Sequence, residues 1–552
     1  MVGAPRDEAT PEDSELSDAP SSNLSRSTAV MAAGTTLSRL TGFGRVFALA
    51  YALGLTRLTD AYNLANTTPN IVYELVVGGV LSATLLPVFV RLHATEDEEE
   101  AWRGTSAVVT TVLVAVTVLS VVLALAAPAM IHLYTLAAKG SATEVEALRS
   151  VGTTLLRWFA PQVALYGMVT VATALLHARR RFGIPMFAPV LNNLVVIGVL
   201  LALPHVADDL SVERFRSDGR ALAFLGLGTT AGVAAMALPQ VMAVVRRHRR
   251  RLRWHWDPRH AAVRTVVRLS AWTFGFTVAN QVAYWVVLLL ASRREGDLSA
   301  YQAAYQYFFL LPHGIIAVSV MTAIQPDLAE RWSLGDVAGF RDRLGTGLRT
   351  VIAALVPAAI GYLVLARPIV ALLLEHGAMS RSDARTVADV LAVMAVGLPG
   401  FSAYLLLMRA FQAMQDARTV FLLYLAENAA NVVLAVALYP AFGVRGLAAA
   451  FAAAYLGGTI AALATMRTRT GGIAVRALAT TTARVCAASA AMALAAGLVS
   501  AVIGGASGPR LLARVAGAVA AGVTVYVAAA RALGVGELTA LLRIGKRKRQ
   551  PE

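Results

Sequence analysis

Charged residues are scarce in this sequence: they account for 15% of its 552 residues, whereas hydrophobic residues account for 57%. A soluble globular protein has about 25% charged and about 45–50% apolar residues. A soluble enzyme, a coiled coil and a disordered scaffold are therefore disfavoured. Cysteine occurs once, at Cys486, which excludes a disulfide framework and a cysteine-based metal site.

Catalytic and nucleotide-binding motifs are also absent. The sequence has no HExxH pattern, no GxSxG pattern and no GxxxxGK followed by Ser or Thr, which argues against a zinc protease, acyl transfer and direct ATP hydrolysis. The loops between its apolar runs are too short to hold a catalytic domain. We therefore expect a protein that is not an enzyme and that needs no cofactor and no metal.

The sequence is instead a series of long apolar runs. A hydrocarbon core of ~30 Å is crossed by about 20 helical residues, and a backbone in lipid must satisfy its own hydrogen bonds, so runs of this length predict membrane helices. The expected fold is an all-α polytopic membrane protein. Fourteen spans are expected, over residues 28–55, 66–93, 105–135, 150–178, 186–206, 221–245, 262–292, 299–326, 346–373, 384–413, 418–440, 443–466, 478–504 and 511–535.

Six spans precede a basic mid-chain loop and eight follow it. This count suggests two six-helix lobes and a terminal helix pair, as in transporters built from duplicated halves. The predicted organisation is a disordered cytoplasmic tail (1–27), a first lobe (28–245), a basic cytoplasmic linker (246–261), a second lobe (262–466), the terminal pair (467–542) and a basic cytoplasmic tail (543–552).

The net charge of +16 lies in the tails and loops between apolar runs, so we expect the chain to contact a phospholipid bilayer and no nucleic acid. One alternate set of loops holds most of the arginines, including those in 179–181, 246–260 and 546–549. The positive-inside rule places this set and both termini in the cytoplasm. The loop 246–260 itself is either a topology determinant or a patch that binds anionic lipid or nucleic acid.

Ionisable residues inside the predicted spans are candidates for function, because a charge in a membrane helix needs a partner or a water-filled cavity. Arg39 and Arg45 are six residues apart, so they do not share one helix face, although Gly42 and Gly44 between them allow a bend. Two interpretations stay open. Both arginines bind an anionic headgroup through bidentate contacts, or one reaches the interface while the other pairs with a buried carboxylate.

Carboxylates and amides supply further candidates. Asp60 lies in the connection before the second span, where it either caps the next helix or pairs with an arginine. Glu74 is a candidate buried carboxylate that pairs with an arginine of the first span or binds a coupling cation, and Glu427 is a second candidate for the cation. The stretch 302–307 (QAAYQY) forms a polar and aromatic stripe that either stacks on sugar rings or packs helices together.

Several motifs occur in an order that is typical of one family. The chain has SRLTGFGR (38–45), DAY (60–62), PN (69–70), Gly78–Gly79, RFGIPMFAPVLNN (181–193), LEHGAMSRSD (374–383) and RAFQAMQDARTV (409–420). Over about residues 28–535 the chain resembles the MurJ (MviN) lipid II flippases, which belong to the multidrug/oligosaccharidyl-lipid/polysaccharide exporter superfamily.

The resemblance implies a flippase that moves the undecaprenyl-pyrophosphate-linked peptidoglycan precursor, lipid II, from the inner to the outer leaflet of the bacterial cell (inner) membrane by alternating access. It implies two lobes around a central cationic cavity and a terminal helix pair that forms a groove for the lipid tail. It also implies a drive from the membrane potential or an ion gradient, so a coupling ion is a further expected partner. By position, Arg39 and Arg45 match the family's two essential arginines, Asp60 its acidic residue and Asn70 its asparagine.

The sequence departs from the family pattern at two places. An aromatic residue, Tyr73, stands where many members have arginine, and Gln306–Tyr307 stand where they have Asp-Arg. The full set of predicted substrate-binding residues is Arg39, Arg45, Asp60, Asn70, Tyr73, Glu74, Gln306 and Tyr307. The alternatives are an exporter of another polyprenyl-linked oligosaccharide, a cation-coupled exporter of small molecules from the same superfamily, and a non-transporting scaffold for cell-envelope synthesis.

Overall fold

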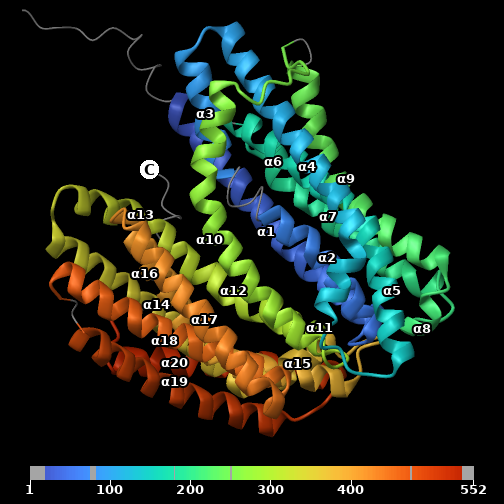
Figure 1. The fold of residues 1–552 in the computed structure, drawn as a ribbon. Coiled ribbons are helices and arrows are strands. Elements are labelled where there is room, and N and C mark those ends of the chain that lie inside the picture. The colour runs from blue at the N-terminus through green and yellow to red at the C-terminus, as the bar shows by residue number, and fades with distance from the viewer. Residues whose placement is uncertain (1–18, 75–81, 180, 249–250, 473–474, 538–552) are drawn as a thin grey trace, which may run out of the picture.

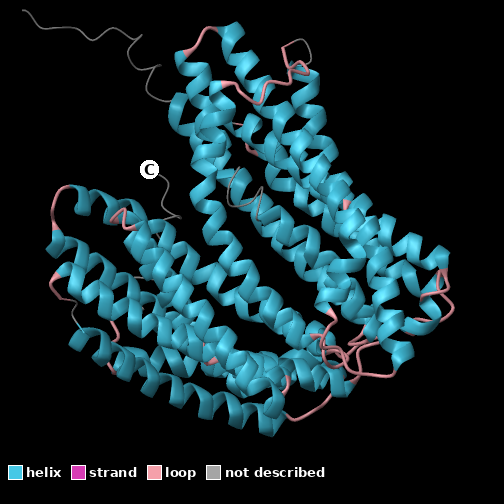
Figure 2. Ribbon diagram, in the orientation of Figure 1, coloured by secondary structure: helices cyan, strands magenta, loops and turns pink. Residues whose placement is uncertain are grey.

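The computed structural model describes residues 19–74, 82–179, 181–248, 251–472 and 475–537, and every regular element within these ranges is a helix (Figure 1, Figure 2). The apolar runs form helices because a helix satisfies nearly all its backbone groups within one segment. The predicted all-α membrane fold is therefore confirmed.

The helices form two bundles that meet at one end and diverge toward the other (Figure 1). The first bundle contains α1 (Ala19–Leu53), α2 (Arg57–Tyr73), α3 (Ser82–Thr95), α4 (Glu98–Tyr134), α5 (Ala142–Phe159), α6 (Pro161–Ala178), α7 (Gly183–Ala202), η3 (Leu203–His205), α8 (Val212–Phe215) and α9 (Gly219–His248). The second contains α11 (Asp297–Ala303), η4 (Ala304–Phe309), α12 (Leu310–Pro312), η5 (His313–Ala317), α13 (Val318–Ser333), α14 (Val337–Leu374), α15 (Arg381–Ala395), α16 (Leu398–Ala413), α17 (Ala417–Phe442), α18 (Val444–Thr470), α19 (Val475–Ile503) and α20 (Gly508–Ala532).

The connection between the bundles is α10 (Ala261–Ala291), which packs against α3 and α4 of the first bundle and against α17 of the second. The terminal pair, α19 and α20, packs against α14. The Tyr526 hydroxyl donates to the Ala353 carbonyl, and Arg349 Nε forms an ion pair with Glu537 Oε1 at 2.7 Å. The terminal pair is thus attached along α14.

The lengths of the helices fit a bilayer. Among the described residues, ten helical stretches are long and apolar enough to cross it, and the bent pair α15–α16 makes an eleventh. The three other predicted spans fall on α1, on α2 with α3, and on α10. The total of fourteen spans stays a prediction.

Several helices begin earlier than the sequence predicts. The first helix starts at Ala19, so residues 19–27 of the predicted disordered tail are helical, while residues 1–18 lie outside the described part of the chain. The helix α2 starts at Arg57 rather than at 66, because the Thr56 hydroxyl caps it by accepting from Thr59 N at 3.3 Å.

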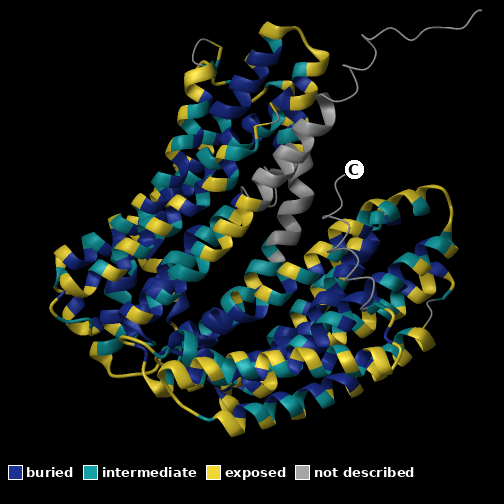
Figure 3. Cartoon of the chain, turned by 180° about the vertical axis from the view of Figure 1, so that it is seen from behind, coloured by how far each residue is buried: buried dark blue, intermediate teal, exposed yellow. Residues whose placement is uncertain are grey.

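Large apolar side chains are exposed on the outer faces of the helices; Figure 3 shows exposed positions along the outermost helices, α19 and α20. Leu494 is 77% exposed and Leu498 67%, which suits contact with acyl chains rather than water. Between helices, small residues allow close approach. A Cβ added at Gly397 would lie 2.6 Å from the Ala452 Cα atom of α18, whereas a Cβ at Gly457 would meet nothing within 4 Å.

This contrast predicts opposite effects of the same substitution. We expect Gly397→Ala to lower the free energy of unfolding by about 1–3 kcal/mol, because the added methyl overpacks against backbone. The control Gly457→Ala, in the interior of α18, should be neutral or stabilising by up to about 1 kcal/mol through helix propensity. Thermal unfolding in one detergent checks both. Equal melting temperatures for the two variants would contradict the packing argument.

Candidate binding cavity

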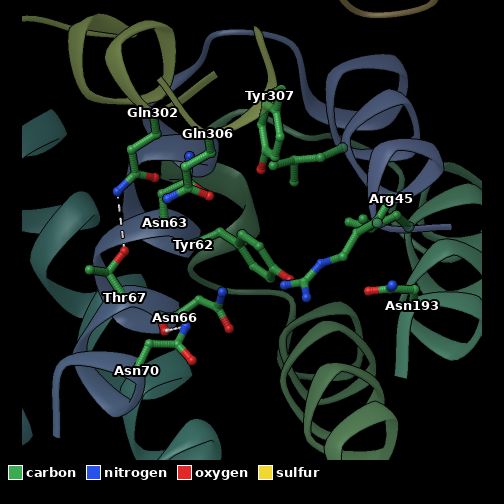
Figure 4. A pocket seen from close by; sticks show the side chains of 13 residues that line it. Arg45, Tyr62, Asn63, Asn66, Thr67, Asn70, Asn193, Gln302, Gln306 and Tyr307 are labelled. Atoms are coloured by element: carbon green, nitrogen blue, oxygen red, sulfur yellow. Dashed lines mark hydrogen bonds between the residues drawn. The ribbon is translucent and has the colours of Figure 1, made fainter. Parts of the chain in front are cut away.

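A polar cavity of about 210 Å³ lies where the two bundles face each other (Figure 4). Its wall comes from α1, α2 and α7 of the first bundle and from α11 and η4 of the second. The lining residues are Gly42, Arg45, Leu49, Tyr62, Asn63, Asn66, Thr67, Asn70, Asn193, Leu200, Gln302, Gln306 and Tyr307. Amides and hydroxyls therefore dominate a cavity that is deep inside an apolar protein.

Arg45 supplies the positive charge of the cavity. Its guanidinium points toward the Tyr62 hydroxyl and the Asn193 side (Figure 4). Helix α1 runs without a break through Gly42 and Gly44. A Cβ at Gly42 would lie 3.5 Å from Asn193 Nδ2 of α7, which is ordinary van der Waals contact. No carboxylate among the described residues forms an ion pair with Arg45.

The α2 wall of the cavity is a polar stripe. Asn63, Asn66, Thr67 and Asn70 are spaced by three, one and three residues, which places them on one helix face. Asn70 Nδ2 donates to the Asn66 carbonyl at 2.9 Å, whereas the Asn66 side chain makes no hydrogen bond to any described residue. The stripe thus presents amide groups to a ligand in the cavity.

The opposite wall comes from the second bundle. Gln302 Nε2 donates to Thr67 Oγ1 at 3.1 Å, which links the two walls. The chain then becomes π-helical over η4, a change of winding that is frequent at functional sites. Gln306 and Tyr307 line the cavity there, while Tyr305 turns away and packs on Phe451 with ring centroids 5.5 Å apart. The predicted polar and aromatic stripe is therefore divided between cavity and helix packing.

Beside the cavity the bundles join at a contact that we call the seam, formed by residues 51–63 and 134–139 of the first bundle and by residues 292–299 and 378 of the second. Asp60 is its centre: Oδ2 accepts from Gly296 N at 2.8 Å, and Oδ1 accepts from Ser299 Oγ at 2.7 Å and Ser299 N at 3.2 Å. Asp60 thus caps α11 of the other bundle, where a negative charge also suits the helix dipole.

Further bonds of the seam use the backbone. Arg57 N donates to Glu295 Oε1 at 3.0 Å, and its guanidinium donates to the carbonyls of Ser292 and Lys139. Gly54 and Gly296 have φ of +60° and +76°, and a Cβ on either would lie within 3 Å of a carbonyl oxygen of the facing bundle. Glycine is needed at both positions for this close approach.

The structure brings half of the predicted site residues into the cavity wall: Arg45, Asn70, Gln306 and Tyr307. The other four, Arg39, Asp60, Tyr73 and Glu74, do not line it. Asp60 lies in the first turns of α2, not in a connection, and the helix that it caps is α11, not the next helix along the chain. This correction follows from the early start of α2.

The remaining three lie at the edges of the site. Arg39 is exposed and sits against η5: a Cβ added at Gly314 would be 2.6 Å from its Nη1. Glu74 is exposed rather than buried, and it accepts from Gln281 Nε2 of α10 at 3.0 Å. The predicted pair of Glu74 with Arg39 or Arg45 is absent from the described residues. Tyr73 packs on Tyr166, with ring centroids 4.8 Å apart.

A second polar feature lies inside the second bundle. Glu427 is 3% exposed, and neither carboxylate oxygen has a hydrogen-bond partner among the described residues. The rings of Tyr404 and Tyr455 pack near it, and the Tyr404 hydroxyl also has no partner there. A buried carboxylate without compensation is costly, so this position needs a proton or a cation.

Sequence reasoning missed Tyr62, Asn63, Asn66 and Thr67 as cavity residues. The signal was present, since the stretch 62–70 repeats polar residues at helical spacing. The predicted second span begins at 66, so it divides these polar residues between a connection and a helix, and their common helix face is not apparent. Gln302, from the predicted polar and aromatic stripe, lies in the wall, and so does Asn193, the last residue of the motif at 181–193.

The chain is similar to known proteins along most of its length. The family model described as lipid II flippase MurJ matches residues 49–512. A probable lipid II flippase MurJ of Rhizobium meliloti (strain 1021) is 27% identical over 421 residues, 76% of each chain. The lipid II flippase MurJ of Burkholderia cenocepacia is 26% identical over 407 residues, 72% of this chain and 75% of its own.

Solved structures show the same fold. A lipid II flippase MurJ in an inward closed conformation superposes with a TM-score of 0.72 at 20% identity, covering 91% of this chain and 97% of that one. A multidrug resistance MATE family transporter of the MOP superfamily, in an inward-facing conformation, has a TM-score of 0.63 at 14% identity and covers 80% of this chain and 96% of that one.

The seam generates a prediction about the balance between conformations. Asp60→Ala removes three hydrogen bonds to α11, so we expect the population with a parted seam to rise about tenfold or more, because a hydrogen bond to a charged group contributes about 1.5–3 kcal/mol. In a Cys486→Ser background, spin labels on Glu146 and Ala441 would report a longer distance. The control Asp209→Ala, in an exposed loop, should leave the distances unchanged; an unchanged distribution in Asp60→Ala would contradict the role of the cap.

Proposed function

We infer the function from the family, because the chain belongs to the lipid II flippase MurJ family: it is a multi-pass membrane transporter that flips lipid II, the lipid-linked precursor of peptidoglycan. The observation that carries the finer proposal is the cavity with one guanidinium and a wall of amides between the two bundles. We propose that this cavity takes the pyrophosphate and sugars of the headgroup while the polyprenyl tail stays in lipid.

The orientation of the chain in the membrane supports movement of the headgroup from the cytoplasmic to the outer leaflet of the bacterial inner membrane. The arginine-rich segment 251–259 lies at the end at which the bundles diverge, and the positive-inside rule assigns that end to the cytoplasm. The seam then closes the external side. In this state the cavity receives the headgroup from the cytoplasm.

Arg45 is the group that we propose for the phosphate. A pyrophosphate in hydrocarbon would lose its hydration without compensation, whereas a guanidinium gives it two parallel charge-assisted hydrogen bonds. Arg45 is free for this because it has no carboxylate partner among the described residues. Asn66, Gln306 and Tyr307 supply neutral polar groups at the sugars. One guanidinium rather than several also keeps release fast.

Occupancy is coupled to the seam through two amides. Asn63 and Gln302 line the cavity and also bond across the bundles: Asn63 Nδ2 donates to Ser299 Oγ at 2.9 Å, and Gln302 Nε2 donates to Thr67 Oγ1 at 3.1 Å. A headgroup that accepts from these N–H groups competes with two bonds between the bundles: Asn63–Ser299 in the seam and Gln302–Thr67 beside it. Binding therefore favours parting of the seam, as differential affinity for two states requires.

The membrane potential supplies direction. Moving one elementary charge is worth ~2.3 kcal/mol per 100 mV, so an interior-negative potential favours the outward movement of an anionic headgroup. We propose that Glu427 adds an ion to this cycle. Its burial without a partner suits a proton or a monovalent cation, which the neighbouring tyrosine rings also attract.

The test of the cavity is Arg45→Ala. We expect the initial rate of headgroup exposure in proteoliposomes to fall about tenfold or more, since a charged hydrogen bond contributes about 1.5–3 kcal/mol. The variant should also fail to rescue a strain depleted of its precursor flippase. Arg39→Ala should slow flipping less, because Arg39 lies outside the cavity wall.

The control for this experiment is Arg216→Ala in an exposed loop, which should flip and rescue as the unmodified chain does. Rescue by Arg45→Ala at the level of this control would refute the phosphate assignment. A chain that never rescues, although it inserts normally, would point to the scaffold or to a different polyprenyl-linked cargo.

The test of coupling is Glu427→Gln, which mimics the neutral carboxyl. We expect flipping to continue but to lose its dependence on an imposed ion or pH gradient, because the position then needs no compensating cation. Glu330→Gln, an exposed carboxylate on α13, serves as the matched control. A gradient dependence equal to that of the unmodified chain would show that Glu427 is not the ion site.

A further inference from the structure

The loop between α9 and α10 follows an unusual path over the first bundle, visible as a loop across this bundle in Figure 2. Arg251 forms an ion pair with Glu98 at the start of α4, and His255 N donates to Thr110 Oγ1 at 3.1 Å, three turns further along. The loop then returns, and His260 Nε2 lies 3.2 Å from Glu100 Oε1. At 1.5 Å per residue it descends about 18 Å along α4.

This descent brings two tryptophans to the boundary of the apolar region. Residues 107–131 of α4 contain no charged residue, so His255, beside Thr110, lies just inside the level where the helix becomes apolar. Trp254 and Trp256 flank it and are 72% and 53% exposed. Exposed indoles at this depth match the aromatic belt of membrane proteins, where the ring is in lipid and the N–H is hydrated.

A cavity of about 620 Å³ lies beside the tryptophans, between the loop and α4. Its charged side chains are Glu98, Glu99, Arg103, Arg251 and Arg253. Arg251 is paired with Glu98, and Arg103 with Glu99 at 3.5 Å. The Arg253 guanidinium has no partner among the described residues, although its backbone N donates to Ser106 Oγ at 3.3 Å. The guanidinium of Arg253 is thus the positive charge of the cavity that no carboxylate among the described residues balances.

Trp102 forms a further part of the cavity wall. It is only 5% exposed, yet its indole Nε1–H has no hydrogen-bond partner among the described residues. Its ring is held between His93 and His248, with centroids 5.0 Å and 4.8 Å away. A buried donor of this kind needs an acceptor.

We propose that this cavity binds the headgroup of an anionic phospholipid from the leaflet at this end of the molecule. The phosphate accepts from the Arg253 guanidinium, the headgroup packs against Trp102 in the cavity wall, and the acyl chains run beside Trp254 and Trp256. The depth of the tryptophans favours a lipid over a soluble protein or nucleic acid, because both would leave the two indoles in water. The bound lipid holds the loop between α9 and α10 against α4.

The experiment uses the full chain in phosphatidylcholine vesicles that contain phosphatidylglycerol, with bromine on the acyl chains of either lipid at equal mole fraction. The quenching of Trp254 and Trp256 is obtained by difference from a variant with Trp254→Phe and Trp256→Phe. We expect brominated phosphatidylglycerol to quench with about fivefold preference, which corresponds to the ~1 kcal/mol that one basic residue near anionic lipid contributes.

Arg253→Gln should abolish this preference, whereas the control Arg259→Gln, on the same loop but outside the cavity, should keep it. Equal quenching by the two lipids in the unmodified chain would overturn the anionic site, and absence of quenching by either would overturn the membrane contact as well. If Arg253→Gln does not fold, the comparison of lipids on the unmodified chain still decides. Because no lipid II is present, the result is independent of flipping.

Discussion

The rest of this structure depends on one constraint: a guanidinium in the middle of a membrane protein that has no carboxylate partner among the residues the structure describes. Such a charge is tolerated only where water or polar groups surround it. Arg45 meets this condition because α2, α7 and η4 turn amides and hydroxyls toward it and form the polar cavity. The apolar core elsewhere in the two bundles leaves the cavity as the natural place for an anion.

The cavity in turn depends on the seam. Two bundles of apolar helices have no hydrophobic reason to associate within lipid, so their contact relies on hydrogen bonds and close packing. Asp60 supplies the hydrogen bonds. Its buried carboxylate accepts three of them from N–H and O–H groups at the start of α11, and these bonds offset the free-energy cost of burying the charge. Gly54 and Gly296 allow the backbones to approach closely enough for these bonds.

The sequence predicted what hydrophobicity and charge determine, and missed what helix register determines. Apolar runs are long and unambiguous, so the spans and the helical fold followed from them. Arg45 was found because a charge inside an apolar run is rare. Arg39 is equally rare in sequence, but six residues place it on another face of α1, and no rule of spacing says which face meets the second bundle.

Asp60 and Glu74 also show that the hydrophobic pattern of the sequence does not locate the start of a helix. Both were assigned from their distance to a predicted helix start, and Thr56 begins α2 about nine residues earlier than expected. That shift places Asp60 inside α2, where its carboxylate caps α11 of the other bundle. Glu74 is exposed and bonds to Gln281 of α10. Contacts between bundles, 236 residues apart in the chain for Asp60 and Gly296, cannot be inferred from local pattern.

The division of work between Arg45 and the amides bears on how a transporter avoids trapping its cargo. A state that binds the headgroup very tightly would not release it. Only a difference in headgroup affinity between the two states shifts the conformational equilibrium between them. In the mechanism that we propose, Arg45 of α1 contributes similarly to headgroup binding in both states, because it belongs to one bundle. Asn63 and Gln302 would each exchange a bond between the bundles for a bond to the headgroup, so their contribution would differ between the states. In this proposal the charge provides recognition, and the two neutral amides couple occupancy to opening.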